Sequence, residues 1–183
     1  KASLDEMVKD ITAEMKESKG DPPVEVTTSP KGVTLEISGD FSFGSGSAAI
    51  SSGLKKLLEE KIVPEIKNSI FQIEVAGHTD SDQLPKAFQK QFPSNWELST
   101  ARGSSVVRNI ISHGVDPTRL VAAGFADWVP RDRGDAGIAL KTLDKQTILQ
   151  FNDTSEKKGR NRRIEITFLK PAHHSTSYVG SDG

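Results

Sequence analysis

The chain has 183 residues, with 24 Lys and Arg against 25 Asp and Glu, so its net charge at neutral pH is -1. This balance argues against a protein that binds nucleic acid by neutralising phosphates, because such proteins usually carry a basic excess. The absence of cysteine excludes disulfides and thiol chemistry. No apolar run approaches the roughly 20 residues of a membrane-spanning helix. The chain begins at Lys1 rather than at methionine, so we expect a piece of a longer protein with any anchor or export signal upstream.

The first predicted element is a helix over about Leu4–Ser18. Ser3 and Glu6 form a capping box at its start, and Gly20 with the following proline pair ends it. Its apolar residues recur at a heptad-like spacing: Leu4, Met7, Val8, Ile11 and Met15. The helix either packs on its own domain or connects, as a dimer, to an upstream part. We assign residues 1–22 to this helix and its linker.

Two segments that alternate apolar and polar residues follow, at Val24–Thr27 and Val33–Ile37, and the turn residues between them predict a hairpin. The stretch Gly39–Ser47 is rich in Gly and Ser, which indicates a loop pinned by its two phenylalanines. An apolar stripe then predicts a helix over about Ser47–Asn68, bent or ended near Pro64.

The second half of the domain repeats this alternation. A strand over Phe71–Val75 leads into Gly77, and a helix over Asn95–His113 precedes Gly114, which is placed as a C-cap. Two further strands are expected, a short buried one at Leu120–Phe125 and a last one at Arg163–Leu169. Because helices separate strands in this order, we predict an α/β (α+β) two-layer sandwich with a mixed sheet over residues 23–170.

The connection Asp127–Lys158 is about thirty residues long, which exceeds most connections in compact domains. We expect a partly ordered insertion, with a weak helical pattern over Ile138–Phe151. Residues 171–183 are predicted to form a mobile tail.

A strand end and a helix start supply the residues that best suit a binding site. The strand ends at Gly77-His78-Thr79-Asp80, and the helix begins near Asn95 and carries Leu98, Ser99 and Arg102 on one face. A carboxylate facing a guanidinium makes a site for a small group that bears both charges. One structural alternative is a salt bridge from Arg102 to Asp80 or Glu97. Another is helix capping, since both Ser94 and Asn95 are residue types that favour the N-cap.

Other chemistries have weaker support. His78, Asp80 and Asp82 alternate as metal ligands can, but the turn that follows breaks their common face, and the tail pair His173-His174 is not expected to bind metal; we predict no metal and no cofactor. No serine lies in a nucleophile elbow. Asp80 with Asp82 or Glu97 leaves glycoside hydrolysis by paired carboxylates open.

The basic cluster Gly159–Arg163 allows a nucleic-acid patch. Arginines that flank an edge strand and hold nearby carboxylates are the interpretation we favour, because the net charge is -1. We therefore predict no nucleic-acid partner.

Four motifs in order resemble the OmpA-like peptidoglycan-binding domain. The resemblance covers about Val33–Leu169 and is greatest, over Phe92–Arg102, to the B subunits of ion-driven stators, the MotB type. The motifs are Gly77-His78-Thr79-Asp80, Asn95-x-x-Leu98-Ser99-x-x-Arg102, Leu120-x-x-x-Gly124-Phe125 and Asn161-Arg162-Arg163-Ile164-Glu165-Ile166.

The resemblance implies a non-catalytic site in which Asp80 and Arg102 hold the diaminopimelate residue of the peptidoglycan stem peptide. Thr79, Asn95 and Leu98 would line the pocket, with Asn161 and Arg162 supporting it, and Asp80 would pair with Arg102 when the site is empty. The family usually has alanine where this chain has Gly103, which weakens a helix by up to about 1 kcal/mol.

The same resemblance implies the periplasmic domain of an inner-membrane-anchored protein. It would be a homodimer that joins a stator A-type membrane subunit through an upstream segment and anchors the motor to the cell wall. The motor would drive a flagellum or an anti-phage defence system. The wall-anchoring domain of an outer-membrane lipoprotein or porin is the alternative.

Overall fold

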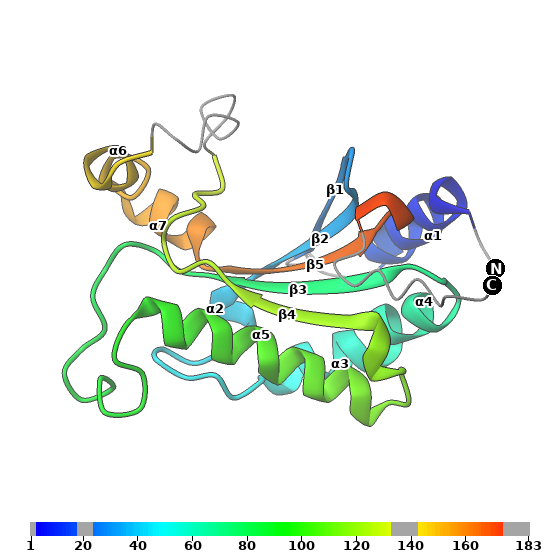
Figure 1. Cartoon of the computed structure of the whole chain (residues 1–183), viewed down its shortest axis with the longest axis horizontal. Coiled ribbons are helices and arrows are strands. Elements are labelled where there is room, and N and C mark those ends of the chain that lie inside the picture. The colour runs from blue at the N-terminus through cyan, green and yellow to red at the C-terminus, as the bar shows by residue number, and fades with distance from the viewer. Residues whose placement is uncertain (1–2, 18–23, 133–142, 174–183) are drawn as a thin grey trace, which may run out of the picture.

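The computed structural model describes residues 3–17, 24–132 and 143–173 (Figure 1). A five-stranded sheet with the order β1-β2-β5-β3-β4 forms its centre. Its strands are β1 (Val24–Ser29), β2 (Gly32–Ser38), β3 (Gln72–His78), β4 (Leu120–Gly124) and β5 (Arg163–Leu169). Only the β3–β4 pair of this sheet is parallel, and the other neighbours are antiparallel. The predicted two-layer sandwich with a mixed sheet is therefore confirmed.

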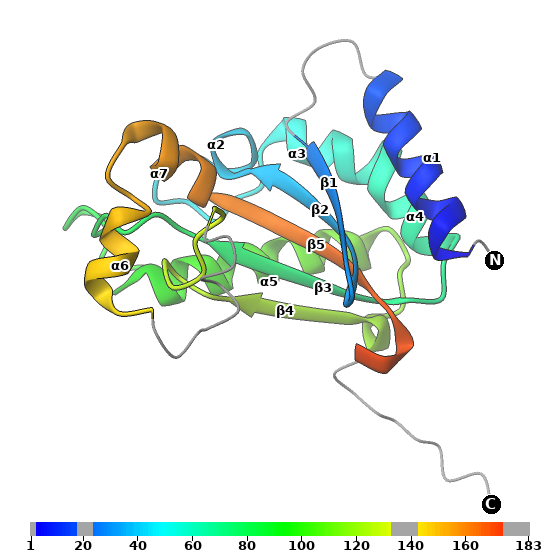
Figure 2. The ribbon, with the colours of Figure 1, turned by 90° about the horizontal axis from the view of Figure 1, so that it is seen from above.

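The helical elements lie mainly on one face of the sheet and at one of its ends. They are α1 (Leu4–Glu17), α2 (Gly39–Ser42), α3 (Ser52–Leu57), the π-helical turn η1 (Leu58–Ile62), α4 (Val63–Lys67), α5 (Asn95–Ser112), the short turn η2 (Pro117–Arg119), α6 (Lys145–Gln150), α7 (Ser155–Asn161) and the short turn η5 (Pro171–His173). The segment from α3 to α4 and helix α5 cover one face, while α6 and α7 lie beyond the end of β3 (Figures 1 and 2). Among described residues, no helix is both long and apolar enough to cross a membrane.

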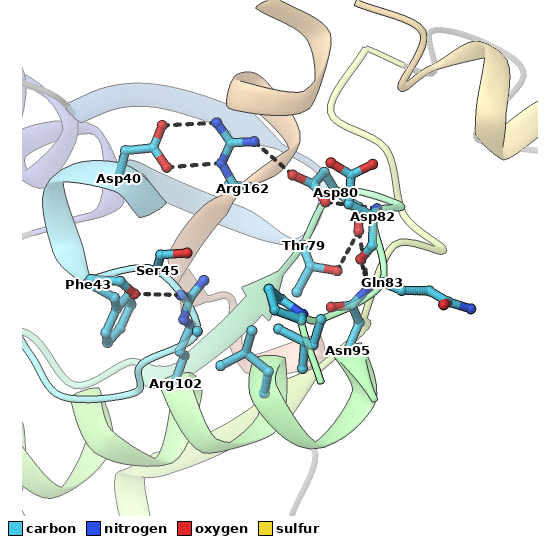
Figure 3. A pocket seen from close by; sticks show the side chains of 15 residues that line it. Asp40, Phe43, Ser45, Thr79, Asp80, Asp82, Gln83, Asn95, Arg102 and Arg162 are labelled. Carbon is cyan, nitrogen blue, oxygen red and sulfur yellow. Dashed lines mark hydrogen bonds and ion pairs between the residues drawn. The ribbon is translucent and has the colours of Figure 1, made fainter. Parts of the chain in front are cut away.

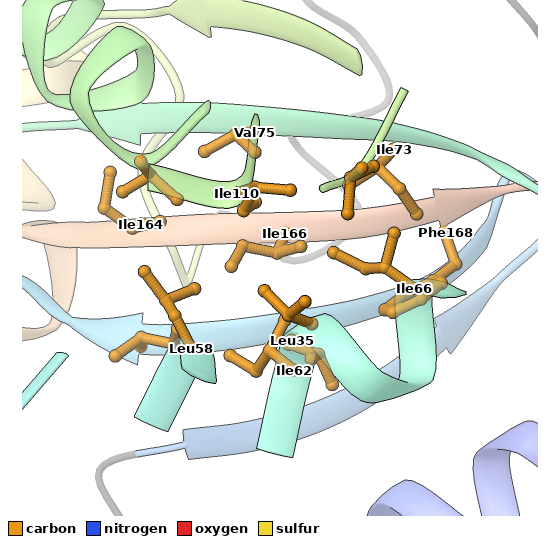
Figure 4. Close-up of a cluster of buried hydrophobic side chains, with 14 of the residues drawn as sticks. Leu35, Leu58, Ile62, Ile66, Ile73, Val75, Ile110, Ile164, Ile166 and Phe168 are labelled. Carbon is orange, nitrogen blue, oxygen red and sulfur yellow. The ribbon is translucent and has the colours of Figure 1, made fainter. Parts of the chain in front are cut away.

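The core lies between the sheet and the helices that cover it. Alternate residues of β2, β3 and β5 point into this layer, as the period of a strand requires, and meet the apolar stripes of η1, α4 and α5 (Figure 4). Helix α1 packs against β1 and β2, and its Ile11 is fully buried in the same cluster. The capping box of α1 is present: Ser3 N donates to Glu6 Oε2 at 2.9 Å, and Glu6 N donates to Ser3 Oγ at 3.3 Å.

The helix predicted over Ser47–Asn68 begins later and is interrupted. Ser51 caps it by accepting a hydrogen bond from Leu54 N at 3.0 Å. The π-helical turn η1 comes directly before α4, and Pro64 lies in the first turn of α4, which ends three residues later at Lys67.

Two strands occupy different places from those predicted. The last strand, β5, lies in the centre of the sheet between β2 and β3, so its arginines do not flank an edge strand. Strand β4 is an edge strand, as is β1, and its residues are half-buried or exposed rather than buried. The order of strands depends on long-range pairing, which local alternation does not specify.

The insertion contains more helix than expected. Helix α6 lies within the predicted helical segment, but Ile138 itself lies outside the described residues, as do the linker at 18–23 and the tail from residue 174. Helix α7 was not predicted, because its residues are almost all polar and show no apolar stripe. Thr154 caps it by accepting from Lys157 N at 3.1 Å.

Candidate functional site

A cavity of about 590 Å³ opens where β2 and β3 end and α5 begins (Figure 3). Its walls come from α2 and the loop after it, the loop after β3, the first turns of α5 and the residue before β5. They are formed by Asp40, Phe43, Gly44, Ser45, Gly46, Thr79, Asp80, Asp82, Gln83, Leu84, Pro85, Asn95, Leu98, Arg102 and Arg162. Every site residue expected from the sequence except Asn161 lines this cavity.

Helix α5 reaches the cavity because it packs unusually close to the sheet. A Cβ on Gly77 of β3 would overlap the carbonyl oxygen of Ser99. A Cβ on Gly103 would lie 2.8 Å from the carbonyl oxygen of Ala123 in β4. Two glycines thus allow the close approach of helix and sheet, and this brings Asp80 and Arg102 to one cavity.

The start of α5 is fixed by Ser94. Its Oγ accepts from Trp96 N at 3.2 Å and donates to Glu97 Oε2, so Ser94, rather than Asn95, is the N-cap. At the other end Gly114 has a positive φ of 88° and donates its N–H to Ile111 O at 2.9 Å, as predicted for a C-cap glycine.

Arg102 is a buried cation, only 7% exposed. Its Nε donates to Ser47 O at 2.9 Å, and its Nη2 donates to Gly44 O at 3.2 Å. The guanidinium carbon lies 4.9 Å from the centre of the Phe43 ring. Burial lowers the pKa of Arg102 to about 10, against the opposing effect of the charges of Asp40 and Asp80. No carboxylate among the described residues forms a salt bridge with it, so its predicted salt bridges to Asp80 and Glu97 are wrong.

Arg162 is the residue that pairs with Asp80. Its Nη1 lies 2.7 Å from Asp80 Oδ2, while its Nε and Nη2 hold the two oxygens of Asp40 at 2.9 and 3.0 Å. The hydrogen bond with Asp40 is the largest effect on the pKa of Arg162, and with that of Asp80 it raises this pKa despite burial. Arg162 therefore forms ion pairs with both carboxylates, whereas Arg102 is held by backbone carbonyls.

The strand register explains this arrangement. Ser38 of β2 and His78 of β3 both pair with Arg163 of β5. Asp40 and Asp80 each follow two residues later, so they lie on either side of Arg162. Asp40 was missed by sequence reasoning, although its position two residues past the end of a strand matches that of Asp80. Finding it required knowing that β5 lies between β2 and β3.

The remaining predicted residues shape the cavity. Asp80 Oδ1 accepts from Asp82 N at 2.9 Å, which turns the chain after β3. Asn95 Nδ2 donates to Asp82 O at 2.9 Å and thereby ties this turn to α5. Thr79 Oγ1 donates to Asp80 O at 2.8 Å, and the buried Leu98 supplies an apolar wall.

Asn161 has a supporting position rather than a place in the wall. It is 3% exposed. Its Nδ2 donates to Phe151 O and Asn152 Oδ1, both at 2.9 Å, and its Oδ1 accepts from Arg131 N at 2.8 Å. Asn152 Oδ1 also accepts from Ser81 N at 3.3 Å. The insertion is therefore bonded both to the residue before Arg162 and to the residue after Asp80.

His78 and the arginines of the basic cluster Gly159–Arg163 pair with acidic side chains in and near the sheet. His78 is 2% exposed, its Nε2 lies 3.2 Å from Glu165 Oε2, and its ring stacks on Phe125. Within the described residues, no three His, Asp or Glu side chains are grouped to hold a metal ion. Arg160 pairs with Asp132 and Arg163 with Glu165, which confirms that these arginines hold nearby carboxylates.

Comparison with known proteins identifies related chains. The pattern of the OmpA family matches residues 42–139. The uncharacterised protein YtxE of Bacillus subtilis is 28% identical over 91% of this chain and 60% of its own length. Motility protein B of the same organism is 24% identical over 85% of this chain and 52% of its own length. The chain thus spans about half to three fifths of these relatives.

Solved structures share the fold. A MotB-like protein from Desulfovibrio vulgaris superimposes with a TM-score of 0.72 at 21% identity, covering 91% of this chain and 94% of that one. The cell wall anchor of the T6SS from Pseudomonas aeruginosa gives a TM-score of 0.66 at 26% identity, covering 89% and 97%. The periplasmic domain of Helicobacter pylori MotB superimposes with a TM-score of 0.62 at 23% identity, covering 80% of this chain and 88% of that one.

Proposed function

The chain belongs to the OmpA family, and from this premise we propose that its cavity binds the stem peptide of peptidoglycan without catalysis. The observation that carries the proposal is Arg102, a buried guanidinium that faces the cavity with no acid partner among the described residues. A buried cation is costly unless an anion or good hydrogen bonds compensate it. A ligand carboxylate entering the cavity supplies that anion.

The chemistry of the opposite wall selects the rest of the ligand. Arg102 Nη1 has no hydrogen-bond acceptor among the described residues, since only Nε and Nη2 reach carbonyls. Asp80 lies on the other side of the cavity and can accept an ammonium group in addition to its bond from Arg162. Diaminopimelate carries an ammonium and a carboxylate on one carbon, so it can meet both residues at once.

Binding of this kind suits an anchor to the cell wall. The relatives include motility protein B and the cell wall anchor of a secretion system. We propose that this chain is the periplasmic domain of a stator-type protein, joined as a homodimer to a membrane subunit through a segment upstream. A lipoprotein anchor is the second candidate, because "Probable lipoprotein YiaD" of Escherichia coli is 26% identical over 79% of this chain.

Sedimentation with purified peptidoglycan tests the binding. The wild-type domain is expected to sediment with the sacculi, whereas Asp80→Ala, Arg102→Ala and the double variant are expected to stay in solution. Asp153→Ala and Arg108→Ala are matched controls, because both residues are exposed and outside the cavity. Normal sedimentation of a folded double variant would contradict the proposal.

A wall hydrolase remains the alternative of another class. It would use Asp80 or Asp82, but both carboxylates are held in ion pairs, with Arg162 at 2.7 Å and Lys158 at 3.1 Å. Incubation with peptidoglycan followed by analysis of soluble fragments separates the two functions. Release of fragments that depends on Asp80 would favour the hydrolase.

A further inference from the structure

The guanidinium of Arg102 is placed by the loop that follows α2, residues 43–47. Its Nη2 donates to Gly44 O at 3.2 Å, and its Nε donates to Ser47 O at 2.9 Å (Figure 3). The ring of Phe43 lies 4.9 Å from the guanidinium carbon. Because both hydrogen-bond acceptors that Arg102 has among the described residues belong to this loop, a displacement of the loop also displaces the guanidinium.

Gly46, in the same loop, lies against an aromatic ring that is distant in the sequence. Its φ is 64°, in the region that favours glycine. A Cβ at this position would lie 2.8 Å from Cγ and Cδ2 of Phe88 and 3.1 Å from its Cδ1, so the ring packs directly on the backbone of the loop. Phe88 belongs to the loop after β3, whose residues Asp82 and Leu84 line the cavity. The ring therefore joins two loops that line the cavity.

Phe88 is bonded within its own loop. Its N–H donates to Pro85 O at 2.9 Å, and its carbonyl oxygen accepts from Gln91 N at 3.1 Å and from Phe92 N at 2.9 Å. Phe92 is 7% exposed, and its burial anchors this turn. Phe88 itself is half-buried and is not one of the described residues that form the core cluster. Replacing Phe88 should therefore release the loop of Arg102 and leave the core intact.

We propose that Phe88 is a positioning residue for Arg102. Its ring fixes residues 43–47, and the carbonyls of that loop aim the guanidinium at the ligand carboxylate. Phe88 does not itself line the cavity, so it acts through the loop. The inference rests on the proposed function, which assigns the ligand carboxylate to Arg102. Phe88 then governs only this half of recognition, because Asp80 is held by Arg162 and by Asp82 N.

Nuclear magnetic resonance of the free domain tests whether Phe88 fixes the guanidinium. The Nε–H of Arg102 is buried and donates to Ser47 O, so its signal is expected to be sharp in the wild-type domain. Phe88→Ala is expected to speed exchange of this hydrogen with water by at least about tenfold. Phe88→Tyr is expected to keep the wild-type signal, because the contact with Gly46 involves Cγ and the two Cδ atoms rather than the far end of the ring.

Calorimetric titration tests whether the positioning reaches the ligand. Two stem peptides are compared that differ at one residue, diaminopimelate in one and lysine in the other. Phe88→Ala is expected to reduce the preference for the diaminopimelate peptide from at least about tenfold to about twofold, with an unchanged affinity for the lysine peptide. Gly46→Ala is expected to do the same, since its Cβ would displace the Phe88 ring. Lys90→Ala, an exposed change in the loop of Phe88, is the control.

The outcomes separate the two proposals, provided that urea unfolding shows each variant to be folded. The positioning role would be refuted if Phe88→Ala kept the wild-type signal of Arg102, kept the wild-type preference, or weakened both peptides to the same extent; the proposed function would then stand. If the wild-type domain bound the two peptides equally, the proposed function would fail. The signal of Arg102 needs no ligand, so it would still decide whether Phe88 fixes the guanidinium.

Discussion

Arg102 and Arg162 carry the same side chain into one cavity but are held in opposite ways. Arg162 grips two carboxylates, which raises its pKa, whereas Arg102 is held by two backbone carbonyls and an aromatic ring, and burial lowers its pKa to about 10. The charge of Arg162 is thus already paired with two carboxylates. The charge of Arg102 has no such partner among the described residues and can pair with a ligand carboxylate. This difference is the basis for assigning ligand recognition to Arg102.

Replacing Arg102 with lysine keeps the charge and removes the planar fork. The ammonium of lysine cannot bond both loop carbonyls and a ligand carboxylate in the arginine geometry. We expect Arg102→Lys to weaken binding of the stem peptide by at least about tenfold, as measured by titration calorimetry. Arg108→Lys on the exposed side of α5 serves as the control, and an unchanged affinity in Arg102→Lys would contradict a role for the planar guanidinium.

Glu165 supplies a pH-dependent contribution to stability. Burial raises the pKa of Glu165, but the hydrogen bond from His78 and the charges of Arg163 and His78 together lower it well below the ordinary value of 4.5. A carboxylate whose pKa is depressed by folding stabilises the fold above its unfolded pKa, and this contribution is lost as the pH falls through the folded pKa.

We therefore expect Glu165→Gln to lower the free energy of unfolding by about 2 kcal/mol at pH 7. The difference from the wild-type chain should shrink as the pH falls below about 4. Urea titrations at a series of pH values measure it. A difference that stays constant from pH 7 to pH 3 would show that the ionised carboxylate is not the cause.

At the scale of elements, the close contact of α5 with the sheet decides the shape of the site. Gly103 looks unfavourable in the sequence, because glycine weakens a helix. In the structure, a Cβ at this position would lie 2.8 Å from the carbonyl oxygen of Ala123, which is too close for a real side chain. The glycine is therefore required by packing.

Gly103→Ala tests this explanation, because helix propensity and packing predict opposite signs. Helix propensity alone predicts that the free energy of unfolding rises by up to about 1 kcal/mol. Overpacking predicts instead that it falls by about 1–3 kcal/mol. We expect the loss, measured by denaturant unfolding. Ser104→Ala, one residue further along the same helix, is the control, and a stabilised Gly103→Ala would contradict the packing argument.

Features that depend on interactions between residues close in sequence could be predicted, whereas features that depend on long-range pairing could not. The five strands and helix α5 could be predicted because their apolar residues repeat at the local period, and Asp80, Arg102, Asn95 and Leu98 follow from motifs on them. The pairing of Asp80 with Arg162 could not be predicted, because Arg162 reaches Asp80 only when β5 lies between β2 and β3. The same long-range pairing brings in Asp40.

Across the whole molecule, the insertion is bonded to the binding site. Lys158 pairs with Asp82 at 3.1 Å, and Asn152 links Ser81 to Asn161. A polar helix such as α7 has no local signal strong enough to predict, yet it leads directly into Arg162. The insertion and the loop after β3, which lines the cavity, are therefore joined in one bonded framework.

The central claim is that one cavity holds both charges of a zwitterionic centre. It is tested most directly by titrating the wild-type domain with two stem peptides that differ at one residue, diaminopimelate in one and lysine in the other. Lysine keeps the ammonium but lacks the carboxylate that Arg102 would bind. We predict that the diaminopimelate peptide binds at least about tenfold more tightly than the lysine peptide. Equal affinity for the two peptides would contradict the account.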